Sequence, residues 1–141
     1  MAAVYFEDLH IGARFESQWS EPIRETTIVT YAAITGDRLH EALPGGLVLV
    51  QGNLAVALAA GLLFDVGHFT ETLYTQARKD THFRSPLYAG ERIRAIETVL
   101  ALEDRPGKPY GRVDLKREVM KDGGVVVHES YQEYRIRKRS A

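Results

Sequence analysis

The pattern of apolar and polar side chains differs between the two halves of the chain. In the first half, apolar residues recur at helical spacing from Glu25 to Thr35, and Gly36 then suits a left-handed helix end. After the turn residues Pro44-Gly45-Gly46 comes a long, almost uncharged stretch, Leu47 to Phe64, with Gly67 shortly beyond it. The pattern predicts a short helix, a tight loop and a long helix that is buried on all sides.

The second half is rich in β-branched and aromatic residues, which favour strands. Strands are predicted at Leu73–Phe83, Arg92–Leu102, Arg112–Met120 and Val125–Arg137, with a further one near Arg14–Ile23. Lys121-Asp122-Gly123-Gly124 is predicted to join the last two strands as a hairpin. About five strands and one apolar helix bury that helix best if an antiparallel sheet curls around it, so we expect an α+β fold.

Composition narrows the class of protein. The 141 residues suit a single domain spanning 1–141, and the net charge of −1 argues against a nucleic-acid partner. With no cysteine, disulfides and thiolate zinc sites are excluded, and the cytoplasm is the expected compartment. The N-terminus lacks the features of a secretory signal, and the polar Gln51 and Asn53 make the Leu47–Phe64 stretch a core helix rather than a membrane span.

Candidate chemistry is concentrated where the short helix ends. Asp37 and His40 place a carboxylate and an imidazole in one loop, a combination suited to proton transfer in a dry cleft. Gln51-Gly52-Asn53 opens the long apolar stretch a few residues later. The simpler alternatives are that Asp37 is a turn residue, that His40 is a loop histidine, and that the two amides satisfy backbone groups.

A set of segments stands out by its order and spacing: Tyr5–Leu9, Ile11-Gly12, Arg14-Phe15, Tyr31–Asp37, Gly52 and Phe83–Glu91. In this order and spacing they are similar to the MaoC-like hot-dog family, which includes the (R)-specific enoyl-CoA hydratases. The resemblance covers nearly the whole chain. It implies a hot-dog fold, in which an antiparallel sheet of about five strands wraps around a long central helix, and a homodimer or higher homo-oligomer.

The resemblance also implies hydration or dehydration of an acyl thioester, of the enoyl-CoA or 3-hydroxyacyl-CoA type. Members typically carry Gly-Asp-x-Asn-Pro-x-His, whose Asp and His act on water and on the substrate α-carbon. Here the matching text is Gly36-Asp37-Arg38-Leu39-His40, in which Asn-Pro is missing and the Asp-to-His spacing is two residues shorter. Asp37 and His40 are therefore the candidate catalytic pair.

The remaining candidate site residues concern the substrate. Backbone amides near Gly52 are expected to hold the enolate oxygen, with Gln51 and Asn53 as possible side-chain donors. Arg84 is a candidate contact for a coenzyme A phosphate, although a strand arginine is more often solvated or salt-bridged. We expect no metal and no cofactor beyond the coenzyme A of the substrate, because the histidines lack metal-ligand spacing.

Two alternatives remain open at this stage. Hot-dog proteins also hydrolyse thioesters with a lone carboxylate and a helix N-terminus, a role in which Asp37 would be the base. The shortened motif and the Gln51-Gly52 pair, where many relatives have His-Gly, equally suit a non-catalytic acyl-thioester-binding subunit. In each case the expected partner is an acyl-CoA or an acyl-carrier-protein thioester, with no membrane involved.

Overall fold

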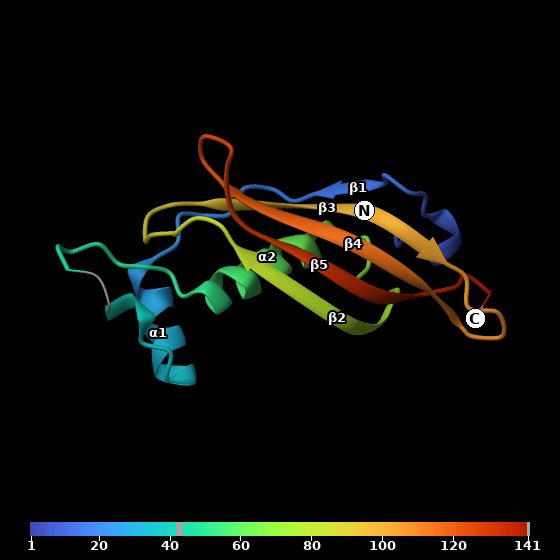
Figure 1. Ribbon diagram of the computed structural model, residues 1–141, viewed down its shortest axis with the longest axis horizontal. Helices are drawn as coiled ribbons and strands as arrows, with labels where there is room; N and C mark the ends of the chain where they lie inside the picture. The colour runs from blue at the N-terminus through green and yellow to red at the C-terminus, as the bar shows by residue number, and fades with distance from the viewer. Residues whose placement is uncertain (42–43, 141) are drawn as a thin grey trace.

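The computed structural model describes residues 1–41 and 44–140, and it contains one five-stranded antiparallel sheet (Figure 1). The strands are β1 (Arg14–Glu16), β2 (Leu73–Phe83), β3 (Ile93–Glu103), β4 (Tyr110–Lys121) and β5 (Val125–Arg137), in the order β1-β3-β4-β5-β2. The helices are α1 (Glu25–Thr35) and α2 (Gly52–Val66), with 3-10 turns η1 (Phe6–Asp8) and η2 (Leu39–Glu41). The prediction of an α+β hot-dog fold with about five strands is confirmed.

Helix α2 lies along one face of the sheet, while α1 stands beyond the start of α2 at one end of the molecule (Figure 1). The buried residues Leu54, Ala59 and Leu63 of α2 belong to the same apolar cluster as Ile93 of β3 and Val119 of β4. Burying one large apolar side chain contributes roughly 1.5–3 kcal/mol, so this contact fixes the helix on the sheet. The start of α2 is thereby held at the end of the sheet nearest α1.

The long helix begins later than the apolar pattern predicts. Residues before it run beside the segment that follows β2: the amide of Val50 donates to the carbonyl of Leu87 at 2.8 Å, and the amide of Ala89 donates to the carbonyl of Val48 at 2.9 Å. This pairing uses backbone groups that a helix from Leu47 would need for itself. The helix therefore starts at Gly52 and ends at Val66, before Gly67 with φ +85°.

The predicted bounds of α1, β2 and β5 agree with the structure, and β4 and β5 form the expected hairpin with Lys121 opposite Val125. The first strand is much shorter than the predicted Arg14–Ile23. Beyond Glu16 the chain still follows β3, but the hydroxyls of Ser17 and Ser20 accept the amides of Ala95 and Ile93, each at 2.9 Å. Side-chain acceptors thus replace part of the regular ladder and end the strand.

Across residues 1–41 and 44–140, none of the helices has the length and apolar character needed to span a bilayer.

Candidate functional site

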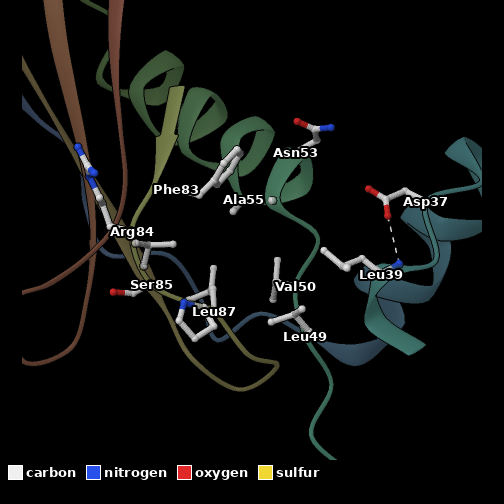
Figure 2. A pocket seen from close by; sticks show the side chains of 13 residues that line it. Asp37, Leu39, Leu49, Val50, Asn53, Ala55, Phe83, Arg84, Ser85 and Leu87 are labelled. Carbon is white, nitrogen blue, oxygen red and sulfur yellow. Dashed lines mark hydrogen bonds between the residues drawn. The ribbon is translucent and has the colours of Figure 1, made fainter. Parts of the chain in front are cut away.

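A pocket of about 480 Å³ lies where the loop after α1, the start of α2 and the segment after β2 meet (Figure 2). Its wall is largely apolar, with Leu39, Leu49, Val50, Phe83, Leu87 and Val127 among the lining residues. Asp37, Asn53 and Arg84 supply polar groups to the same wall. An apolar pocket with a few convergent polar groups is the usual form of a small-molecule site.

Asp37 is held by the backbone geometry at the end of α1. Gly36 takes the left-handed conformation with φ +80° and closes the helix. The carboxylate oxygen Oδ1 of Asp37 then accepts the amide of Leu39 at 3.1 Å, drawn as a dashed line in Figure 2. This is the turn role that Asp often has, and it is compatible with a place in the pocket wall, because the second carboxylate oxygen is not used by the turn.

Gln51 connects the loop to both helices. Its side chain is fully buried, and Nε2 donates to the carbonyl of Ile28 in α1 at 3.0 Å and to the carbonyl of Asp37 at 3.2 Å. Gln51 is not among the residues that line the pocket. Its amide donors are engaged by the backbone, so in this arrangement Gln51 positions the Asp37 loop against the start of α2 rather than presenting a donor to the pocket.

His40 lies close to Asp37 in sequence but outside the pocket wall. It belongs to η2, its side chain is 13% exposed, and its Nε2 is 3.8 Å from Oε1 of Glu41. Within the described parts of the chain, its Nδ1 is buried without a hydrogen-bond partner, and no hydrogen bond joins it to Asp37. The structure thus places Asp37 in the pocket wall, whereas the imidazole of His40 lies outside that wall.

The first turn of α2 forms one side of the pocket. Gln51 occupies the N-cap position without a capping hydrogen bond from its side chain, so the first-turn amides are not capped. Gly52 permits close packing there, because a Cβ at this position would lie 2.8 Å from Cε1 of Phe83. Asn53 is exposed and lines the pocket beside Gly52. The positive end of the α2 dipole therefore faces the pocket.

Arg84 lines the pocket together with the adjacent Phe83 and Ser85, but its guanidinium points away from Asp37 in Figure 2. Its Nη2 donates to Oε1 of Glu129 on β5 at 2.6 Å. The hydrogen bond from Arg84 holds the pKa of Glu129 below its ordinary value. The salt-bridged alternative is the one present here, and about half of the Arg84 side chain is exposed to solvent.

The apolar walls are the part of the site that sequence reasoning missed. Phe83 at the end of β2 is 55% exposed, and Leu39 is 45% exposed, although both are strongly apolar. A large apolar residue at a strand end, directly before Arg84, was the available signal for Phe83. For metals, the described residues contain no group of three or more His, Asp or Glu side chains able to hold an ion.

Neither the profiles of known protein families nor the curated protein sequences give a match to this chain. Solved structures do match. A monoamine oxidase regulatory protein from Archaeoglobus fulgidus is 26% identical, with a TM-score of 0.83 over 96% of this chain and 95% of that one. A MaoC-like dehydratase from Rhodospirillum rubrum is 20% identical, with a TM-score of 0.81 over 97% of this chain and 99% of that one.

An (R)-hydratase from Pseudomonas aeruginosa in its unliganded form is similar over 97% of this chain and 88% of that one, at 20% identity and a TM-score of 0.75. Such likeness extends over the sheet, the central helix and the segments around the pocket. The chain therefore has the fold of the MaoC-like hot-dog proteins.

Proposed function

We propose that the protein is a hydratase or dehydratase that acts on an acyl thioester of the enoyl-CoA or 3-hydroxyacyl-CoA type. One observation carries the proposal: the carboxylate of Asp37 and the uncapped first turn of α2 share the wall of one apolar pocket. The structures similar to this chain support it, because they include proteins described as a MaoC-like dehydratase and as an (R)-hydratase.

The proposed chemistry follows from these positions. The thioester carbonyl accepts hydrogen bonds from the first-turn amides at Gly52 and Asn53, where the helix dipole favours the negative charge of an enolate. Asp37 takes a proton from a water molecule while the water oxygen bonds to the β-carbon of the enoyl group. The electron pair of the double bond moves onto the thioester, and the α-carbon then receives a proton. Dehydration is the reverse sequence.

His40 is the proposed donor of the α-carbon proton. Its imidazole does not line the pocket of the single chain, so the proposal requires it to turn toward the pocket when the thioester binds. Catalytic hydrogen bonds are often long in unliganded sites and shorten in the complex, and the Nδ1 of His40 has no partner to give up within the described residues.

Recognition of the carrier is assigned to Arg84. The Arg84 side chain is 53% exposed and lies at the pocket, where it is bound to Glu129, whose side chain is 16% exposed. Glu129 also lies 3.8 Å from the Nζ of Lys116, so its charge keeps a partner when Arg84 turns to a phosphate of coenzyme A. A guanidinium also matches the geometry of phosphate well.

A second copy of the chain is proposed to complete the site by pairing at β2. This strand is at the edge of the sheet, so one side of its backbone is unpaired within the described chain, and most of its residues are exposed. Large apolar side chains of this strand are exposed, with Tyr74 at 43% and Phe83 at 55%. Edge pairing buries such groups and satisfies the open backbone.

Thioester hydrolysis is the second candidate function, and the position of His40 favours it. A hydrolase needs one carboxylate to activate water and a helix N-terminus for the oxyanion, and the pocket wall contains these two without the imidazole. In that case the water attacks the thioester carbonyl carbon and the thiol leaves.

One assay distinguishes these functions. The purified protein is incubated with crotonyl-CoA while loss of the conjugated double bond and release of free thiol are followed in parallel. We expect loss of the double bond without thiol release. Thiol release identifies a hydrolase instead, and binding with neither signal identifies an acyl-thioester-binding subunit, so either result overturns the proposal.

A further inference from the structure

A second and smaller cavity, of about 130 Å³, lies between the C-terminal half of α2 and the inner face of the sheet. One side of it is apolar, with Leu63, Phe64 and Leu73 in the wall. The other side is charged, with Lys79, Glu97 and Arg117 from three different strands. None of the residues that line this cavity lines the Asp37 pocket.

Glu97 is already fully paired inside the cavity. It is 1% exposed, its Oε1 is 2.9 Å from Nε2 of His68, and its Oε2 accepts Nη2 of Arg117 at 2.9 Å. The same Nη2 donates to the hydroxyl of Tyr134 at 2.8 Å. Burial raises the pKa of Glu97, but His68 and Arg117 outweigh it, so the pKa lies below its ordinary value and the group stays anionic.

Lys79 supplies a second cation for which the described chain provides no anion. No ion pair or hydrogen bond joins its ammonium group to any residue in the ranges 1–41 and 44–140. Burial and the charge of Arg117 lower the pKa of Lys79 to about 8, although Glu97 opposes this. Burial, Lys79 and Arg117 likewise lower the pKa of the neighbouring His128 to about 4. In both groups burial is the largest cause, and the positive charge of Arg117 adds to it.

We propose that this cavity is a second ligand site that binds a short-chain monocarboxylate. The carboxylate lies against Lys79 and the guanidinium of Arg117, and the alkyl chain lies against Leu63, Phe64 and Leu73. The volume is roughly four times the ~30 Å³ that one water molecule occupies in the liquid, so it suits an acid of about four carbons. An apolar wall opposite two cations favours such an acid over a fully hydrophilic anion such as phosphate.

The test is a titration of the full chain with sodium butyrate, followed by the NMR signals of the His68 and Tyr134 rings. Saturable shifts are expected. Lys79→Met should weaken binding about tenfold or more, because a charge-assisted contact is lost. Arg78→Met is the matched control, since Arg78 precedes Lys79 on β2 but lines a separate hollow with Tyr131 and Glu133. Its affinity should equal that of the unmodified protein.

Three outcomes overturn the proposal. Shifts that do not saturate, or equal weakening in both variants, mean that butyrate meets only the general charge of the surface. Butanol binding as tightly as butyrate means that the cations do not recognise the ligand. Displacement of butyrate by crotonyl-CoA means that the cavity belongs to the acyl pocket. None of these results depends on whether the Asp37 pocket is catalytic.

Discussion

The carboxylates near the two ends of α2 differ in how far they are buried and paired. At the start of the helix, Asp37 lies half-buried in an apolar wall, and one carboxylate oxygen is bound to a single backbone amide. At the far end, Glu97 is almost completely buried, and it is paired with both His68 and Arg117. The two carboxylates therefore contribute differently to the stability of the fold: Glu97 contributes much through its buried partners, whereas Asp37 contributes little.

This difference predicts where a carboxylate is available for chemistry. A group whose lone pairs are all engaged is held in one charge state, while a group with an unused oxygen beside a pocket can exchange a proton with a ligand. Substitution at Asp37 should thus affect turnover and leave stability almost unchanged. Substitution at Glu97 should do the reverse.

The largest expected effect is on turnover in Asp37→Asn. The amide oxygen still accepts the Leu39 amide, so the turn remains, but the base is gone, and kcat with crotonyl-CoA should fall about 10²–10⁴-fold. The unfolding free energy in urea should change by less than about 0.5 kcal/mol. Asp65→Asn, at an exposed position on α2, is the control and should retain full activity. An active Asp37→Asn enzyme would contradict the proposed mechanism.

Glu97→Gln should cost about 3–5 kcal/mol in the urea unfolding free energy, because the Arg117 guanidinium is left buried without its counter-charge. Glu118→Gln, on the same sheet without an ion pair among the described residues, should cost less than about 0.5 kcal/mol. A small effect at Glu97 would mean that the cluster is hydrated and does not hold the core together.

The same variant also has a pH signature. The pKa of Glu97 in the folded protein is below its ordinary value of 4.5, so its contribution to stability is complete above that pH. It is lost as the pH falls from 4.5 through the lower folded value. The unfolding free energy of the unmodified protein should decline in this acid range more steeply than that of Glu97→Gln. Parallel curves would argue against the assigned pKa direction.

A smaller effect is expected from two glycines of α2. At Gly61 an added Cβ meets nothing within 4 Å, so Gly61→Ala should stabilise the protein by roughly 0.5–1 kcal/mol. At Gly52 the same methyl lies 2.8 Å from the Phe83 ring, which must shift. Gly52→Ala should therefore not stabilise the protein, and it should raise the KM for crotonyl-CoA. Adding Phe83→Leu should bring the KM back toward that of the unmodified protein. Equal stabilisation by both alanines would show that Phe83 does not pack at Gly52.

The sequence predicted the fold well where local patterns and tertiary contacts agree. Helix α1, strands β2 and β5 and the β4–β5 hairpin are bounded by glycines, turn residues and β-branched runs that act locally. The apolar stretch begins before α2, at Leu47, because Val48 and Val50 pair with the distant Ala89 and Leu87, which no periodicity of the segment itself reveals. The opening predicted at Gln51-Gly52 agrees with the start of α2 at Gly52.

The site was predictable only in part, for a related reason. The Asp37 loop and the opening of α2 were identified from the sequence, and the structure brings both to one pocket. The position of His40 depends on side-chain packing in a loop shorter than that of the related family, so spacing alone did not fix it. Glu97 had a visible signal, because its place in the alternation of β3 put a charge among the inward-facing Ala95 and Val99.

The two hydrogen bonds of Gln51 also bear on redesign of this protein. They anchor the chain at the carbonyl of Asp37, upstream of the place where the related motif carries its extra Asn-Pro. Grafting those two residues after Arg38 would leave the anchor intact, and the inserted Asn would offer its own amide to the Asp37 turn. Only the loop between Arg38 and His40 lengthens. The graft therefore changes where the His40 imidazole lies, while the Asp37 carboxylate keeps its position.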